Sequence, residues 1–289
     1  MKIRKVIGIN ILLILLIGLS GCGNKTSQNN DNKQPISNQT QNNSTVQIDN
    51  GVQNNTAMSN VSKGSHPSQS NPPKTQKDVI NKLSSVLNTN VPKMLPTDVP
   101  VDNGDYLTAT TVSEKWNYKV NFYQNIQPED IDSATAAKGK LVATVEGTEY
   151  KNAASAKEAI NGYSQVDTSK YPDMDVDLGH NIKALADAGM GHGYLTWNEG
   201  RWCIRLDSPN DSAYKNEEYP DSKKLAEKIV EYLNNYMLPA PEKIGVISVN
   251  NWNNLNGTTI KWQYNQMVYT VWSQDPMTAL KTAVAMNLL

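Results

Sequence analysis

The stretch YLTWNEGRWCIRL, residues 194–206, decides the fold class of this chain. Two short runs rich in aromatic and aliphatic residues flank Asn198-Glu199-Gly200, a composition typical of a tight turn. In the second run Trp202, Ile204 and Leu206 alternate with other side chains, as in a strand with one buried face. The stretch therefore predicts an antiparallel β-hairpin.

Two further stretches, residues 106–122 and 259–272, have the same pattern, the latter with a turn about Tyr264-Asn265-Gln266. The faces expected to be buried are Trp116, Tyr118, Val120 and Phe122 in the first hairpin, Trp202, Ile204 and Leu206 in the second, and Met267, Tyr269 and Val271 in the third. Helical periodicity follows each hairpin, at Pro128–Ala137, Ser222–Met237 and Pro276–Met286, and precedes the first at Gln76–Asn88. We expect an α+β fold of antiparallel hairpins, each followed by a helix, with the three units as candidate divergent repeats.

Leu238-Pro239-Ala240-Pro241 interrupts the pattern. It predicts a boundary between an α+β domain over residues 76–240 and a C-terminal strand–hairpin–helix unit over residues 241–289 that packs on it.

The N-terminus has the composition of an export signal. Met1-Lys2-Ile3-Arg4-Lys5 is cationic, and the 14 residues from Val6 to Leu19 are uncharged and almost wholly apolar. As a helix this run would rise only about 21 Å, less than a bilayer requires. We therefore predict a signal peptide over residues 1–21.

Leu19-Ser20-Gly21-Cys22 follows this run and resembles the lipobox of bacterial lipoproteins, of the Gram-positive type. The resemblance implies cleavage between Gly21 and Cys22, and a diacylglyceryl lipid on the Cys22 sulfur that attaches the protein to the membrane. Two acyl chains would give stable anchoring, because each buried CH₂ contributes about 0.8 kcal/mol. The implied location is the outer face of the cell membrane.

Residues 24–75 contain 19 Asn or Gln and 13 Ser or Thr and no aromatic residue. Such a segment buries too little apolar surface to offset the entropy of ordering. We predict that residues 22–75 form a disordered tether between the lipidated cysteine and the globular part.

Charge and cysteine content argue against a nucleic-acid-binding protein and against an internal disulfide. Loss of Lys2, Arg4 and Lys5 with the signal leaves 24 basic against 28 acidic residues, so nucleic acid is not an expected partner. Once Cys22 is acylated, Cys203 has no partner for an internal disulfide, and we expect it to be a small core residue.

Motifs of catalysis are missing from the sequence. It contains no Gly-x-Ser-x-Gly, Walker loop, His-Glu-x-x-His or Cys-x-x-Cys, and only His180 and His192 follow residue 75. Nothing indicates a cofactor or a catalytic residue, so we expect a non-enzymatic protein.

Asp173, Asp175 and Asp177 alternate, as the ligands of calcium loops do. The run fails the EF-hand pattern because Leu178 stands where Gly is required and Ala184 where Glu is required. A charged edge strand explains the same alternation. The aspartates are therefore only weak candidates for a metal site, and we predict none.

Aromatic side chains on the other face of the strands are candidates for ligand binding. With the turns placed as above, these are Trp197, Trp262 and Trp272. The globular part also resembles domains of unknown function on Gram-positive lipoproteins, through Trp262, Tyr269, Val271 and Asp275-Pro276. We expect a binding or interaction domain for an envelope protein or polymer. The alternative is an envelope-associated hydrolase that uses carboxylates among Asp173, Asp175, Asp177 and Glu199.

Overall fold

The computed structural model describes residues 71–253 and 256–289, which belong to one compact unit. The predicted signal peptide, Cys22 and nearly all of the predicted tether lie outside the described residues. Within the described part of the chain, no helix is both long and apolar enough to span a membrane.

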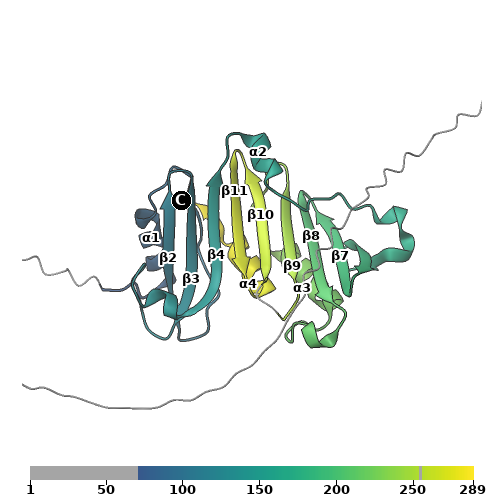
Figure 1. Cartoon of the computed structure of the whole chain (residues 1–289), viewed down its shortest axis with the longest axis horizontal. Coiled ribbons are helices and arrows are strands. Elements are labelled where there is room, and N and C mark those ends of the chain that lie inside the picture. The colour runs from purple at the N-terminus through teal and green to yellow at the C-terminus, as the bar shows by residue number, and fades with distance from the viewer. Residues whose placement is uncertain (1–70, 254–255) are drawn as a thin grey trace, which may run out of the picture. The chain divides into compact units, whose positions relative to one another are not determined.

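The core of the fold is a ten-stranded sheet in the order β2-β3-β4-β11-β10-β9-β8-β7-β6-β5 (Figure 1). Its strands are β2 (Tyr106–Glu114), β3 (Asn117–Asn125), β4 (Lys140–Glu149), β5 (Asp175–Asp177), β6 (Lys183–Gly189), β7 (His192–Glu199), β8 (Trp202–Pro209), β9 (Gly245–Asn250), β10 (Thr258–Tyr264) and β11 (Met267–Ser273). Neighbouring strands are antiparallel except β8 and β9, which are parallel. A separate pair joins β1 (Met94–Pro96) to β12 (Met286–Leu288). The predicted α+β class is thus confirmed, with the sheet dominant.

Residues 241–289 contribute the middle of this sheet. The loop through Leu238–Pro241 leads from α3 into β9, and β9, β10 and β11 lie between β8 on one side and β4 on the other. The sheet is therefore continuous only when the C-terminal segment is in place.

One face of the sheet is covered by α1 (Gln76–Val86), α3 (Ser222–Asn235) and α4 (Pro276–Val284). A row of paired apolar residues crosses seven strands on this face and is fully buried. Its members are Val120, Val145, Val271, Ile260, Ile247, Ile204 and Trp197. Burial of such a row against amphipathic helices supplies the hydrophobic driving force of the fold.

Three of the helices begin directly after a residue whose side chain caps the helix N-terminus. The side chains of Thr75, Asp221 and Asp275 accept hydrogen bonds from backbone N–H groups in the first turns of α1, α3 and α4. These three helices lie where the periodicity predicted them.

The helix predicted at Pro128–Ala137 is wrong: the segment is irregular up to the 3₁₀ turn Ala136–Lys138. Asp132 instead bonds the edge strand β2 through its own N–H and its carboxylate.

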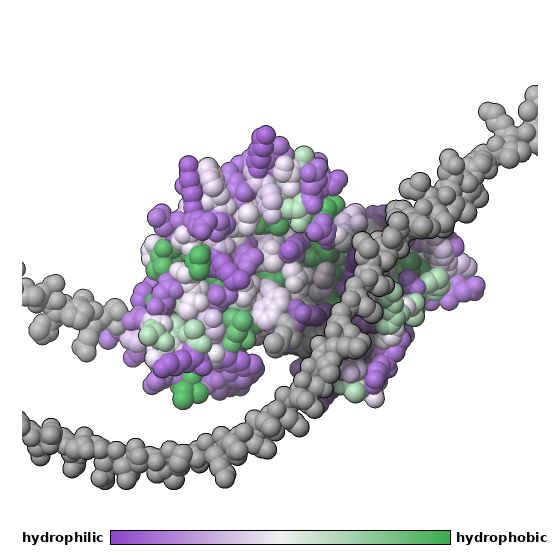
Figure 2. All heavy atoms as spheres, in the orientation of Figure 1, coloured by the Kyte–Doolittle hydropathy of each residue, from purple (hydrophilic) through white to green (hydrophobic). Residues whose placement is uncertain are grey.

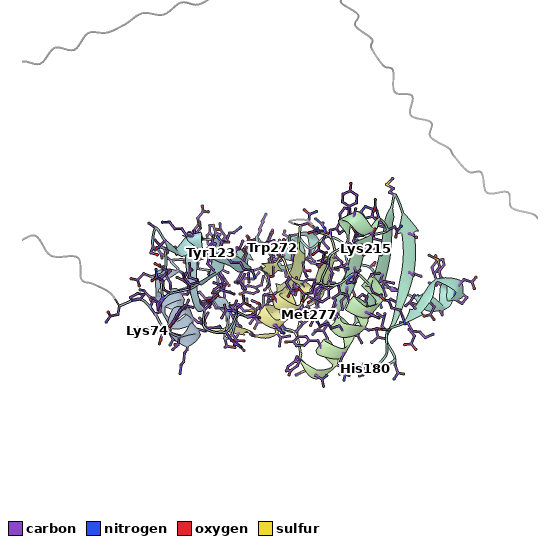
Figure 3. The ribbon with its side chains drawn as sticks, turned by 90° about the horizontal axis from the view of Figure 1, so that it is seen from below. Lys74, Tyr123, His180, Lys215, Trp272 and Met277 are labelled. Atoms are coloured by element: carbon purple, nitrogen blue, oxygen red, sulfur yellow. The ribbon has the colours of Figure 1, made fainter. Side chains whose placement is uncertain are left out.

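The opposite face, which we call the open face, is covered in part by the short helix α2 (Ala153–Glu158) and the loop that follows it. Ala156 and Ile160 pack there against Val246 and Val268 in a small second core. Where Figure 2 leaves this face visible, hydrophilic residues predominate and apolar patches are interspersed among them. Figure 3 places Tyr123 and Trp272 on this side, away from Met277 of α4.

At two positions on the covered face, a glycine leaves space for a large aromatic ring on a neighbouring strand. Gly147 lies between Tyr118 and Tyr269, and Gly245 lies between Trp202 and Trp262 on neighbouring strands. A Cβ at Gly147 would come within 2.4 Å of Tyr118 Cε1, and one at Gly245 within 2.5 Å of Trp202 Cε3. Each ring therefore occupies the volume that a side chain would need.

Candidate functional site

The structure places two of the three predicted binding aromatics in the core. Trp197 and Trp262 are fully buried on the helix-covered face, so their prediction as exposed binding residues is wrong. The cause is the turn length. The hairpin loops are two residues, Gly200–Arg201 and Asn265–Gln266, so Trp197 pairs with Ile204 and Trp262 with Tyr269. A change of one residue in a turn moves a strand's side chains to the other face.

Trp272 does lie on the open face and is partly exposed. Its indole Nε1 donates to the carbonyl of Asn256 at 2.9 Å, which joins β11 to the loop before β10.

Asp175 and Asp177 lie on the edge strand β5, and Asp173 lies in the 3₁₀ turn Pro172–Met174 that precedes it. Asp175 pairs with Lys183 at 2.6 Å, and Asp177 accepts the N–H of Gly179. Among the described residues no group of three or more His, Cys, Asp or Glu side chains could hold a metal ion. The run also does not meet Glu199, which lines a separate groove.

The histidines each contact one carboxylate. His180 Nε2 lies 2.5 Å from Glu231, and His192 Nδ1 lies 2.7 Å from Asp207. The ring of His192 also packs on Trp252, with centroids 4.3 Å apart. In the described part of the chain no Ser or Thr hydroxyl bonds to His192 Nε2, so this His–Asp pair lacks the nucleophile of a hydrolase triad.

A row of polar side chains crosses the open face next to the apolar row of the covered face. We call it the hydroxyl row. Strand pairing places its members side by side from β7 to β2: Thr196, Arg205, Ser248, Thr259, Trp272, Thr144, Asn121 and Thr110. Neighbouring strands lie about 4.8 Å apart, so the row from Arg205 to Trp272 spans roughly 14 Å.

The two halves of the hydroxyl row differ in their hydrogen bonding. Thr144 donates to Asn121, which donates to Thr110, so this half is bonded within itself. The side chains of Thr196, Ser248 and Thr259 make no hydrogen bond to any described residue. This half of the row therefore offers free donors and acceptors.

The free half of the row lies in a trough made of two adjoining cavities of about 270 and 490 Å³. Thr196 and Arg205 line both cavities, and we call the whole the Arg205 trough. The smaller cavity extends over β8, β9 and the loop before β10, and the larger one lies under the loop after α2. Their other lining residues include Tyr163, Tyr171, Tyr194, Asp207, Ser248, Asn250 and Thr259. Aromatic rings beside hydroxyl and amide groups are typical of sites for polar ligands.

Cys203 lies on β8 two residues before Arg205, and is buried as predicted. Its Sγ is 3.6 Å from Ser164 Oγ and 3.8 Å from the carbonyl of Gly162. These contacts join β8 to the loop after α2, so the cysteine is part of the packing beneath the trough.

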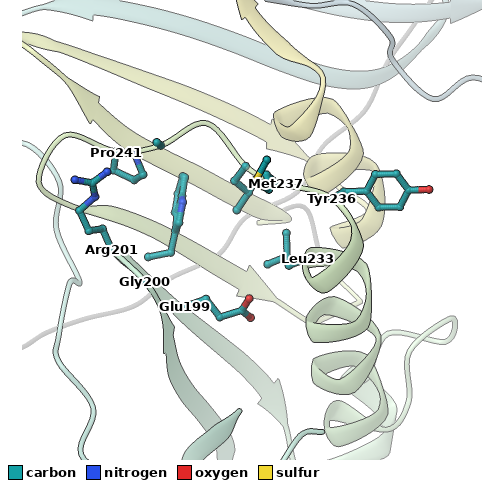
Figure 4. A pocket seen from close by; sticks show the side chains of 10 residues that line it. Glu199, Gly200, Arg201, Leu233, Tyr236, Met237 and Pro241 are labelled. Atoms are coloured by element: carbon teal, nitrogen blue, oxygen red, sulfur yellow. The ribbon is translucent and has the colours of Figure 1, made fainter. Parts of the chain in front are cut away.

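A second, apolar groove of about 350 Å³ lies on the covered face, at the C-terminal end of α3 (Figure 4). Its lining is mostly apolar: Trp202, Leu233, Tyr236, Met237, Leu238, Ala240 and Pro241, with Glu199, Gly200 and Arg201. Glu199 Oε1 accepts a hydrogen bond from Trp197 Nε1 at 2.9 Å. Burial raises the pKa of Glu199, against the smaller lowering effects of that bond and of His180.

Sequence reasoning missed Arg205, Ser248, Thr259 and the trough that they share. The signal was present in β8, where Arg205 stands between the core residues Ile204 and Leu206. Comparisons of the chain with family models, curated proteins and solved structures found no match. A proposal for the globular part therefore depends on its geometry.

Proposed function

We propose that this chain is a membrane-anchored extracytoplasmic lipoprotein whose globular part is a non-enzymatic binding domain at the cell envelope. The lipobox residues Leu19–Cys22 support the anchor and the location. The single observation that carries the binding function is the free half of the hydroxyl row. Thr196 on β7, Ser248 on β9 and Thr259 on β10 have no side-chain hydrogen-bond partners among the described residues. Ser248 and Thr259 are directly paired, and Arg205 on β8 lies between Thr196 and Ser248.

A hydroxylated polymer is the ligand class that fits this row. Side chains on adjacent strands repeat at about 4.8 Å, so an extended chain lying across the strands meets a new hydrogen-bonding group at each one. Trp272, at the end of the free half, adds a partly exposed ring of the kind that packs on sugar rings. Because the sheet is rigid, little ordering entropy is lost on binding.

The test is binding of envelope polymers to the Ser248→Ala/Thr259→Val double variant. We expect the wild-type chain to bind and the double variant to bind several-fold more weakly, because each lost hydrogen bond is worth about 0.5–1.5 kcal/mol. Thr270→Val is the matched control, since Thr270 lies on the same face in the next row and pairs with Lys261 and Glu146. Equal loss in the control would contradict a site on the hydroxyl row.

A second candidate is an envelope-associated hydrolase, favoured by the raised pKa of Glu199 in the apolar groove. A carboxyl group that stays protonated above its ordinary range can act as a general acid. Glycoside hydrolysis requires a second carboxylate on the opposite side of the bond. Among the described residues, Glu199 is the only acidic one that lines the groove. Binding is therefore the better supported function. Release of reducing ends from cell-wall polymer by wild type and not by Glu199→Gln would favour the hydrolase.

We further propose that the three-stranded meanders β2–β4, β6–β8 and β9–β11, each followed by a helix, are divergent copies of one unit. The support is their shared order, three antiparallel strands followed by a helix. Aligned relatives test this: the three segments should resemble one another more closely in less divergent sequences.

A further inference from the structure

We propose that Arg205 binds an anionic oxygen group, a phosphate or a carboxylate, of the hydroxylated ligand in the Arg205 trough. This inference rests on the proposed binding function and names the class of ligand: a polyol or sugar polymer that carries negative charge.

The first observation is the missing ion pair of Arg205. No carboxylate among the described residues lies within 4.0 Å of its guanidinium, and its side chain makes no hydrogen bond to any of them. Arg201 differs, because its Nη1 donates to the carbonyl of Glu242 at 3.2 Å. A guanidinium has five N–H donors in a fork that matches carboxylate and phosphate oxygens.

The second observation is its position. Arg205 lies on β8 with Thr196 directly beside it on β7 and Ser248 directly beside it on β9. The loop after α2 passes close by, since a Cβ added at Gly162 would lie 3.4 Å from Arg205 Nη1. The guanidinium is thus flanked by two hydroxyls and lies where the two cavities of the trough meet.

Among the described residues that line the trough, Arg205 is the cation without an ion-pair partner. Lys170, in the larger cavity, already pairs with Asp167 at 3.3 Å. Asp207, in the smaller cavity, lies two residues along β8, roughly 7 Å away by strand geometry, and its Oδ1 contacts His192. An anion at Arg205 therefore has neither to displace a carboxylate nor to lie directly beside one.

The third observation explains why the ligand should also carry hydroxyl groups. Asn250 lines the smaller cavity, and its Oδ1 is buried without a hydrogen-bond partner among the described residues. A buried acceptor without a donor costs free energy. A ligand hydroxyl would satisfy it, while Thr196 and Ser248 bond to oxygens nearer the anionic group. A simple inorganic anion would reach Arg205 but not Asn250.

The experiment measures binding by calorimetry to the detergent-solubilised full chain, with poly(glycerol phosphate), polygalacturonate and neutral dextran as probes. We expect an anionic probe to bind and dextran to bind at least 10-fold more weakly, with affinity that falls as salt rises. Arg205→Gln should weaken the anionic interaction by roughly 10- to 100-fold. Arg201→Gln, the matched control on the covered face, should bind like wild type.

The outcomes separate this inference from the proposed function. Preference for the phosphate or for the carboxylate polymer identifies the anionic group. Equal binding of dextran, or unchanged binding by Arg205→Gln at an unchanged melting temperature, would overturn the role of Arg205 and leave the binding domain intact. Binding of none of the probes, together with no binding of isolated envelope polymers, would overturn both.

Discussion

Gly147→Ala should destabilise the fold strongly, although it adds only one methyl group. The new Cβ would lie 2.4 Å from Tyr118 Cε1 and 2.7 Å from Cζ, where ordinary carbon contacts are about 3.5–4 Å. The ring would have to move by about 1 Å or more. Its hydroxyl is fixed, because it donates to the carbonyl of Met94 at 2.8 Å and accepts from the N–H of Met94 at 2.9 Å.

The expected cost follows from these two effects. Overpacking in a core costs typically about 1–3 kcal/mol. Loss of the hydrogen bonds of the buried Tyr118 hydroxyl adds about 1–2 kcal/mol. We therefore expect a loss of about 2–5 kcal/mol in the free energy of unfolding, which is a large share of a typical domain's stability.

The assay is equilibrium unfolding in guanidinium chloride, with Gly189→Ala as the matched control. Gly189 is also a strand glycine, but nothing lies within 4 Å of a Cβ added there. The control should be neutral or stabilised by about 0.4–1 kcal/mol, because alanine restricts the unfolded chain. If both variants unfold at the wild-type midpoint, the space at Gly147 is not filled by Tyr118 and the reasoning is refuted.

Three other predictions concern hydroxyl groups, pH and the anchor. Tyr118→Phe should lower the free energy of unfolding by about 1–3 kcal/mol. The loss should exceed that of Tyr269→Phe, because the Tyr118 hydroxyl makes two hydrogen bonds and the Tyr269 hydroxyl makes a single one, to the carbonyl of Pro92. Equal losses of the two variants in denaturant titrations would contradict this. Burial raises the pKa of Glu199 in the folded state, so the folded state binds the extra proton and wild-type stability falls as pH rises from the ordinary glutamate pKa to the raised value. Glu199→Gln should lack this fall, and parallel stability curves between pH 4 and pH 7 would refute it. Cys22→Ser should abolish the acyl mass and membrane partitioning, and unchanged mass and partitioning would count against the lipoprotein assignment.

The positions of α1, α3 and α4 and the buried faces of β3, β8 and β11 could be predicted from the sequence, because local periodicity encodes them. Trp116, which was expected on the buried face of the first hairpin, lies instead in its turn and is 49% exposed. Leu225, Ile229 and their neighbours in α3 repeat at helical spacing, and Tyr118, Val120 and Phe122 alternate along β3. The order of the strands could not be predicted, since β4 pairs with β11 over a separation of more than 100 residues. The faces of Trp197 and Trp262 depended on a single residue in each turn, which composition does not determine.

The proposed binding site could not be predicted from the sequence for a related reason. Arg205, Ser248 and Thr259 come from three strands, and the parallel pairing of β8 with β9 brings Arg205 beside Ser248. Nothing in the local sequence of β8 indicates what its neighbour will be. The cavity walls also come from the loop after α2 and the loop before β10, which are far apart in the chain.

Alternation along β8 places core side chains on one face of the sheet and the side chains of the proposed binding site on the other. Ile204 and Leu206 are buried under the helices, whereas Arg205 and Asp207 face the trough. Substitution of an exposed strand residue with a free side chain changes stability by only about 0.5 kcal/mol. Charge at Arg205 can therefore be changed with little effect on the core that holds it in place. For this reason, weak binding by a folded Arg205→Gln variant would report on the ligand contact itself, and unfolding cannot account for it.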